Sequence, residues 1–332
     1  MKLRQGIVIA LTGLGLGALQ AAPAAAEEPV RPLPLEVKLD AAKVALGGKL
    51  FHDKRLSRDN TIACASCHAL DRGGVDGTPG SVGIGGAKGP INAPTVFNSG
   101  FNFRQFWDGR AASLEEQAAG PVHNPKEMGS AWPEVLAKLA KDDALVAEFQ
   151  AAYADGLQPR NIQDAIATFE RSLVTPNSRF DRHLRGDASA LTADEARGWQ
   201  LFKNYGCVAC HQGVNMGGNM FQVFGVMGDY FARRGNPTEA DLGRYNVTRN
   251  DADRHMFKVP TLRNVALTAP YFHDGSAKTL EDAVEVMFKY QLGRAAPAQD
   301  KAQIVQFLRT LTGEWRGKPL DQLAPAAVAA AR

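Results

Sequence analysis

The sequence lacks several features that would each assign it to a class of protein. It has no apolar run of the roughly 20 residues that a membrane-spanning helix needs. Its formal net charge is only +3 over 332 residues, a balance that argues against nucleic acid as a partner. Alternating apolar and polar residues, which indicate strands, are scarce beside helical spacings. With a hydrophobic content of 45%, the chain is expected to form a packed, mainly α fold.

Cysteine is also sparse, and all four cysteines belong to two copies of one pentapeptide, Cys64-Ala-Ser-Cys67-His68 and Cys207-Val-Ala-Cys210-His211. C-x-x-C-H is the attachment signature of c-type haem, in which both thiols bond to the porphyrin and the His binds the iron. A four-thiolate zinc site would have its pairs closer together and would not explain a His after each pair. A thioredoxin-like motif would need a βαβ pattern, and none is evident. The sequence therefore predicts two haem c groups, with His68 and His211 as iron ligands, and no disulfide.

Residues 1–26 have the pattern of a signal peptide. Lys2 and Arg4 form a short basic region, residues 6–19 are largely apolar, and the three alanines at 24–26 offer a cleavage site. The apolar run is too short for a membrane anchor, and no Cys follows the cleavage site to carry a lipid. Cleavage would lower the formal charge to about +1. We therefore expect a periplasmic protein without stable membrane insertion.

The two halves of the chain repeat one arrangement, in which a helical run ends in Leu-Phe shortly before each haem motif. These runs cover residues 39–51 and 192–203, and the second begins with a capping box of Thr192 and Glu195. The repetition indicates two cytochrome c-like domains, each with one covalently bound haem.

Apolar spacing predicts two further helices, over residues 132–153 and 161–173. Pro176 and its turn-forming neighbours then mark a boundary. The first domain would span residues 27–175 and the second 176–332, with the C-terminal tail packing back on the first domain as one option.

Residues 71–101 differ from their surroundings, with many glycines, three prolines and little periodicity. A long irregular loop inside a compact domain is usually functional or disordered. Because this loop directly follows the first haem motif, we expect it to cover the open face of that haem.

With these motifs in view, the chain resembles the bacterial dihaem cytochrome c peroxidases from about residue 40 to about residue 315. The stretches that carry the likeness are GGVDG (73–77), KGPIN (88–92), QFWDGR (105–110), PTLRN (260–264), APYFHDG (269–275) and the helix with Met287. The resemblance implies an enzyme that reduces hydrogen peroxide to water with electrons from a small cytochrome c or cupredoxin. Electrons would enter at the C-terminal haem and pass to the N-terminal, peroxide-binding haem.

The resemblance implies that Met287 is the second iron ligand of the C-terminal haem, where a thioether raises the potential. From the residues alone the choice is open, because a Met on a helix is more often core filling. The rival methionines are Met216, Met220, Met227 and Met256. A Met at this place also separates the chain from the related dihaem enzyme that matures a protein-derived quinone cofactor, which has Tyr there.

Gln117 and Glu127 match the polar pair of the family's peroxide site. Glu127 would move a proton from the inner to the outer peroxide oxygen, and Gln117 would orient the peroxide and stabilise developing charge. By residue type alone, Glu127 is an ordinary solvated carboxylate. Trp107 matches the residue between the two haems, where it would serve as an electron bridge.

Asn92, Thr268 and Pro270 match the positions whose oxygens bind one calcium in the family. Calcium takes six to eight oxygen ligands, and backbone carbonyls with waters can provide them. His273 lies in the Tyr-Phe-His stretch that the chain shares with the family, and its role stays open at this point.

The chain departs from the family pattern at Ile84, where many members have a His that caps the resting N-terminal iron. Ile cannot bind iron, so the N-terminal haem is expected to be open even when oxidised. His123 is the one nearby His on the expected distal loops, and an exposed loop His is the simpler account of it.

Two other classes of function stay open from the sequence. One is a dihaem electron carrier with both irons closed by two axial ligands, which Gln117 and Glu127 disfavour. The other is a dihaem oxidase acting on a protein or other organic substrate, which Met287 disfavours. A homodimer is one option for the assembly.

Overall fold

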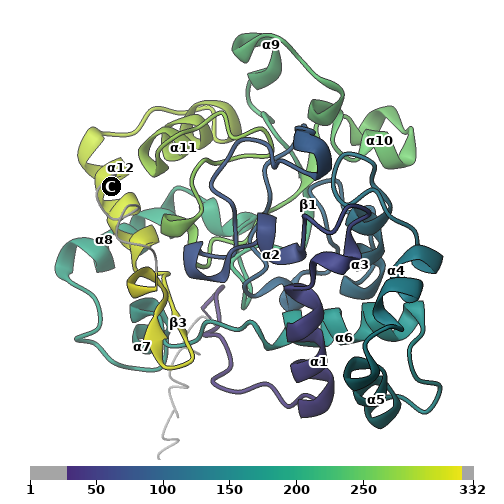
Figure 1. Ribbon diagram of the computed structural model, residues 1–332. Helices are drawn as coiled ribbons and strands as arrows, with labels where there is room; N and C mark the ends of the chain where they lie inside the picture. The colour runs from purple at the N-terminus through teal and green to yellow at the C-terminus, as the bar shows by residue number, and fades with distance from the viewer. Residues whose placement is uncertain (1–27, 324–332) are drawn as a thin grey trace, which may run out of the picture.

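The computed structural model describes residues 28–323, and the expected signal peptide lies outside them. The prediction of a mainly α fold is confirmed, because helices make up most of the regular structure (Figure 1). The helices are α1 (Ala41–Phe51), α2 (Cys64–Cys67), α3 (Leu114–His123), α4 (Trp132–Leu139), α5 (Asp143–Ala152), α6 (Pro159–Ser172), α7 (Arg179–Leu184), α8 (Ala193–Asn204), α9 (Tyr230–Arg234), α10 (Tyr245–Thr248), α11 (Leu280–Val286) and α12 (Ala298–Arg309).

Two small sheets complete the regular structure. Strand β1 (Phe221–Val223) runs antiparallel to β2 (Met256–Lys258), and β3 (Glu314–Trp315) runs antiparallel to β4 (Lys318–Pro319). Residues 71–101 contain only short 3₁₀ turns, as the loop prediction requires. No helix in the described part of the chain has the length and apolar character needed to cross a bilayer.

The predicted helices form, with one difference. Thr192 caps α8 by accepting from the backbone N–H of Glu195, whose side chain accepts from the Thr192 N–H in return, so the capping box is confirmed. The predicted run over residues 132–153 is instead two helices. The chain turns after α4, and the Asp142 side chain caps α5 by accepting from the Leu145 N–H at 3.1 Å. A capping Asp offers the backbone a helix start that apolar spacing does not reveal.

One helix crossing is built twice, once in each half of the chain. Helix α1 crosses α6 in the N-terminal half, and α8 crosses α12 in the C-terminal half (Figure 1). A Cβ at Gly47 would lie 1.9 Å from the Ala165 carbonyl oxygen, and a Cβ at Gly198 would lie 2.0 Å from the Gln303 carbonyl oxygen. Both crossings therefore need a glycine at the closest approach.

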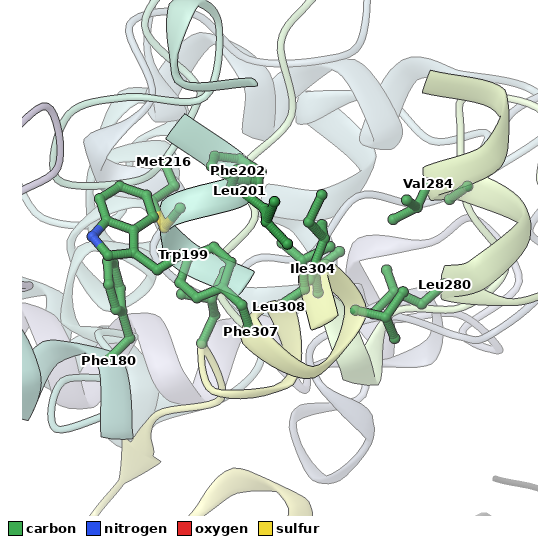
Figure 2. Packing of buried hydrophobic residues seen from close by; sticks show 14 of the residues in the cluster. Phe180, Trp199, Leu201, Phe202, Met216, Leu280, Val284, Ile304, Phe307 and Leu308 are labelled. Atoms are coloured by element: carbon green, nitrogen blue, oxygen red, sulfur yellow. The ribbon is translucent and has the colours of Figure 1, made fainter. Parts of the chain in front are cut away.

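Each crossing anchors a hydrophobic cluster. In the C-terminal half, Phe180 meets both Trp199 and Phe307 edge-on with ring centroids 4.9 Å apart (Figure 2). The N-terminal cluster is mainly aliphatic, and its fully buried members are Leu50, Leu56, Val135, Leu139, Phe149, Ile162 and Ala165.

A second repeat joins the two halves. The segments 92–98 and 258–264 share the pattern Pro-Thr followed by Asn, and both asparagines have a positive φ of 60°. The side chains of Asn98 and Asn264 both donate to the Thr175 hydroxyl, at 2.8 and 2.9 Å. Thr175 thus lies between two equivalent partners, one from each half.

Backbone hydrogen bonds from these two segments also reach the opposite half in a reciprocal way. The Asn92 N–H donates to the His273 carbonyl at 2.7 Å, and the Lys258 N–H donates to the Trp107 carbonyl at 2.8 Å. Trp107 and His273 themselves hold equivalent places, in turns closed by the bridges Gln105–Ala111 and Tyr271–Ala277. The two halves are therefore related by an approximate twofold arrangement around these contacts.

Both ends of the described chain cross between the halves. The Leu33 N–H donates to Asp181, and the Arg31 carbonyl accepts from Arg263, so residues 30–33 lie on the C-terminal half. The predicted domain boundary at residue 175 stays a prediction. At the other end, Trp315 packs edge-on against Phe97 of the N-terminal half, with centroids 5.6 Å apart.

Candidate active site

One large cavity gathers the predicted residues of the C-terminal centre. Cys207, Cys210, His211 and Met287 all line it. Met287 follows α11 and begins a π-helical turn, Met287–Gln291. The thioether that could bind iron therefore lies at the end of a capped helix.

The rival methionines do not line this cavity. Met216 is fully buried in the hydrophobic cluster, where its backbone carbonyl lies 3.3 Å from the His211 Nδ1. Met227 is 61% exposed. Among the described methionines, Met287 is thus the one positioned as a partner for His211.

Both motif histidines present Nε2 to their cavities. The Nδ1 of His68 lies 3.2 Å from the Gly74 carbonyl, and the Nδ1 of His211 is held by Met216 in the same way. Burial lowers the pKa of His68, and it lowers the pKa of His211 to about 4. A neutral imidazole with Nδ1 held by a carbonyl is the form that binds iron through Nε2.

The four thiols are free, and none forms a disulfide. Burial raises the pKa of Cys64 and Cys67, and it raises the pKa of Cys207 to about 12. A thiol pair beside an apolar cavity, followed directly by a His whose pKa is lowered by burial, fits covalent attachment of a porphyrin.

A second cavity gathers the predicted residues of the N-terminal centre. Cys64, Cys67, His68, Gln117 and Glu127 all line it. Gln117 comes from α3, and Glu127 comes from the loop that follows that helix. Gln117 and Glu127, which the peroxidase interpretation requires, therefore line the same cavity as the first haem motif.

Glu127 is held in a definite orientation. The Asn124 side chain donates to its Oε1 at 2.7 Å. Burial raises the pKa of Glu127, while the Asn124 hydrogen bond and the charge of Arg110 oppose the rise. A raised pKa makes a carboxylate a better proton acceptor than an ordinary Glu.

The two centres differ at one equivalent position. Helices α3 and α11 are capped by Ser113 and Thr279, and eight residues after these caps lie Pro121 and Met287. Both of these residues line the cavity of their own half. Proline has no donor atom in its side chain, so the place that supplies a thioether in one half supplies none in the other.

Neither Ile84 nor His123 lines the N-terminal cavity, whereas Ser81 and Gly83 do. The Ile84 N–H donates to the Glu127 carbonyl at 2.9 Å, so this loop supports the loop of Glu127. His123 is exposed and packs edge-on against Trp132, with centroids 5.5 Å apart.

Trp107 lies at the junction of the two halves. Its indole N–H donates to the Asn92 carbonyl at 2.9 Å, and its ring lines the C-terminal cavity. These contacts hold the ring at the place where the backbone hydrogen bonds join the two halves.

The predicted calcium residues converge beside Trp107. The Asn92 side-chain nitrogen donates to the Thr78 carbonyl at 2.9 Å and to the Pro270 carbonyl at 3.2 Å, and Thr268 lines the same space. Carbonyl and amide oxygens are the ligands that calcium takes, so binding the ion here requires the Asn92 amide to turn its oxygen, in place of its nitrogen, toward these carbonyls.

His273 belongs to a buried polar network. Its Nε2 lies 2.7 Å from Asp241 Oδ1, and Arg234 pairs with both Asp241 and Asp274. These three acidic and imidazole groups are close enough to hold a metal ion, but Arg234 already occupies their carboxylates.

Sequence reasoning missed Glu170, which also lines the N-terminal cavity. It is 6% exposed, no described residue donates a hydrogen bond to it, and burial raises its pKa to about 8. The matching residue of the C-terminal half is Leu308, because Ile166, Phe169 and Glu170 of α6 repeat as Ile304, Phe307 and Leu308 of α12. Aligning the two crossings would have revealed a carboxyl group in the place of a core Leu.

Glu170 makes the stability of the protein pH-dependent. Its pKa is about 8 in the folded chain against 4.5 ordinarily, so its contribution is full below about pH 4.5 and is lost as pH rises to 8. We expect E170Q to raise the free energy of unfolding relative to the parent by roughly 4 kcal/mol at pH 7.5 and by little at pH 4.5. Denaturant titrations at both pH values, with E36Q as an exposed control, measure the difference. An equal effect at both pH values would contradict it.

Three comparisons bear on this geometry. A family model described as di-haem cytochrome c peroxidase matches residues 41–189. The cytochrome c peroxidase Ccp of Escherichia coli (strain K12) is 54% identical over 293 residues, covering 88% of this chain and 63% of that protein. The cytochrome c551 peroxidase of Nitrosomonas europaea is 46% identical over 326 residues, covering 97% of this chain and 96% of that protein.

A solved structure agrees with them. The crystal structure of a MauG-like protein associated with microbial copper homeostasis superposes with a TM-score of 0.75 at 31% identity, covering 88% of this chain and 95% of that one. The present chain spans less than two thirds of the Escherichia coli relative but nearly all of the Nitrosomonas europaea relative. The chain therefore belongs to the di-haem cytochrome c peroxidase family.

Proposed function

We propose that this chain is a periplasmic peroxidase that reduces hydrogen peroxide to two waters, with two protons and with two electrons from a small cytochrome c or cupredoxin. The observation that carries the proposal is the contrast between its two cavities. The N-terminal cavity holds Gln117 and Glu127 and has Pro121 where the C-terminal cavity has Met287. One centre is thus arranged for chemistry and the other for electron transfer.

The residues present fit two haem c groups. Cys64 and Cys67 would hold one and Cys207 and Cys210 the other, with His68 and His211 as proximal ligands and Met287 as the second ligand of the C-terminal iron. When bound, these groups supply the one-electron chemistry that amino acid side chains lack. Each would occupy one domain, with the boundary near residue 175.

Glu127 and Gln117 are the side chains that would act on the bound peroxide. Glu127 accepts the proton of one peroxide oxygen and returns it to the other, so that water leaves instead of hydroxide. The Asn124 amide holds the Glu127 carboxylate in place for this transfer. Gln117 orients the peroxide and stabilises the charge that develops as the O–O bond breaks.

Electrons would enter at the Met287 centre and pass Trp107 on the way to the N-terminal centre. A thioether ligand raises the potential of that centre, which suits it to accept electrons from a periplasmic donor. Asn92, Thr268 and Pro270 would bind one calcium at the junction beside Trp107, together with waters.

Steady-state turnover tests the proposal. Reduced cytochrome c or cupredoxin should be oxidised by this protein at a rate that saturates with hydrogen peroxide, with two donor molecules consumed per peroxide. An electron carrier without peroxide chemistry would exchange electrons with the donor but show no peroxide-dependent oxidation. An oxidase of organic substrates would consume peroxide only when such a substrate is supplied.

We expect the exported protein to carry two covalently bound haems, because both C-x-x-C-H motifs line cavities with a free thiol pair and a neutral His. The intact mass of the mature chain should exceed that of the polypeptide by two haems. A single haem, or bound zinc, would contradict the assignment.

We expect the N-terminal haem to be open in the oxidised protein as isolated. Pro121 and Ile84 cannot bind iron, and His123 is exposed outside the cavity. Electron paramagnetic resonance of the ferric protein should show a substantial high-spin signal, and peroxide should react without prior reduction. Two purely low-spin haems with a lag before turnover would show that another side chain closes the site.

A further inference from the structure

Lys258 is a buried cation without a counter-ion among residues 28–323. It is the last residue of β2, is 6% exposed, and lines the cavity of Cys207, Cys210 and His211. No described residue accepts a hydrogen bond from its ammonium group or forms an ion pair with it. Among the described residues that line this cavity there is no Asp, Glu or Arg and no second Lys.

An ammonium group in such a place needs an anion. Burial of a charge without a partner is strongly unfavourable, and buried charges are normally paired or bound to a ligand. Burial alone lowers the pKa of Lys258 to about 8, with no opposing contribution from a carboxylate. No described residue of the cavity supplies the missing negative charge, which makes a bound ligand its candidate source.

The fold itself does not require the ammonium group. Asn92 holds the equivalent place in the N-terminal half and makes the equivalent backbone hydrogen bond across the junction, at 2.7 Å against 2.8 Å for Lys258. The Asn92 side-chain nitrogen donates to the Thr78 and Pro270 carbonyls, whereas the ammonium group of Lys258, which lines the cavity, has no hydrogen-bond partner among the described residues. Asn92 and Lys258 thus make the same backbone hydrogen bond, and only Lys258 adds a positive charge.

We propose that the ammonium group of Lys258 binds a propionate carboxylate of the haem attached to Cys207 and Cys210. This inference rests on the proposed attachment of haem c at the second motif. The propionates are the carboxylates that haem c retains, and an ammonium–carboxylate pair in an apolar cavity forms a strong, charge-assisted hydrogen bond. The Lys258 N–H also holds the Trp107 carbonyl, so one residue would join the edge of this haem to the bridge residue.

The pair has an electrostatic consequence. A positive charge that neutralises a propionate favours the reduced haem, which carries one positive charge less than the oxidised haem. Lys258 would therefore raise the potential of the C-terminal haem in addition to the effect of Met287.

The test is a redox titration of the intact two-haem protein and of three variants. K258M removes the charge and keeps an unbranched apolar side chain, K258R keeps the charge, and K278M removes an exposed lysine as a matched control. We expect K258M to make reduction of the high-potential haem roughly tenfold less favourable, which corresponds to about 59 mV for one electron. K258R should restore most of the shift, and K278M should leave the potential unchanged. Resonance Raman spectra should show an altered propionate bending band in K258M only.

The proposal is overturned if K258M, with both haems attached and a native circular dichroism spectrum, keeps the parent potential and propionate band. It is also overturned if only the N-terminal haem shifts, or if K278M has the same effect as K258M. Potentials and Raman bands do not depend on turnover. A protein that fails to reduce peroxide but shows the Lys258 shift would refute the peroxidase proposal and leave this one standing.

Discussion

Replacing Glu127 by Gln is expected to lower peroxide turnover by roughly 10² to 10⁴ while leaving both haem spectra nearly intact. Gln keeps the size of the side chain and can keep a contact with Asn124, but it cannot take a proton from peroxide and return it. Glu127 is suited to this task because it lines the N-terminal cavity, is oriented by Asn124, and has a pKa raised by burial. Stopped-flow mixing of the protein with peroxide measures the step directly.

The matched control for this variant is E134Q, which removes a carboxylate bound to the Ser130 hydroxyl on the adjoining segment, outside the cavity. We expect E134Q to keep activity within a few-fold of the parent. If E127Q does the same, Glu127 is not the proton-transferring group, and Gln117 would remain as the one polar side chain of the predicted pair.

Replacing Met287 by Leu is expected to lower the potential of the C-terminal haem by a few tenths of a volt, within the roughly 0.8 V range that axial ligands set. Leu fills nearly the same volume, and volume-conserving swaps are tolerated, so the fold should persist. Turnover with the natural type of donor should collapse, because the entry centre would no longer accept electrons readily. A redox titration followed by absorbance measures the potential.

The exposed Met227 provides the control, because M227L removes a thioether that lies outside the cavity. The high-potential wave should be unchanged in M227L and absent in M287L. If the wave persists in M287L, another sulfur binds the iron, and the position of Met287 in the cavity has a packing role only.

Local signals predicted the parts of the fold that depend on neighbouring residues. The capping box at Thr192 and the helices before each haem motif form as expected, because caps and apolar spacing act within one or two turns. The single helix predicted over residues 132–153 is wrong, since the capping side chain of Asp142 competes with continued helical spacing. The path of residues 30–33 onto the C-terminal half depends on Arg263 and Asp181, far away in the sequence.

The site shows the same division between local and distant information. The motifs identified Cys64, Cys67 and His68 without any structure, and the resemblance supplied Gln117, Glu127 and Met287, which the structure places in the two cavities. Glu170 and Lys258 were missed, because an ordinary Glu or Lys is solvent-exposed and no local pattern marks a buried one. Their signal is the internal repeat, in which the partner positions hold Leu308 and Asn92.

The reciprocal contacts at the junction bear on the electron transfer proposed between the two centres. The halves are joined by backbone hydrogen bonds in both directions and by the shared Thr175 hydroxyl. The backbone bonds do not depend on side-chain rotamers, so they hold the two halves in a fixed relation. The proposed transfer between the two centres would then need no docking search, unlike the proposed delivery by an external donor. Added glycerol or sucrose should therefore slow the reaction with the donor in proportion to solvent viscosity and leave the internal transfer rate unchanged.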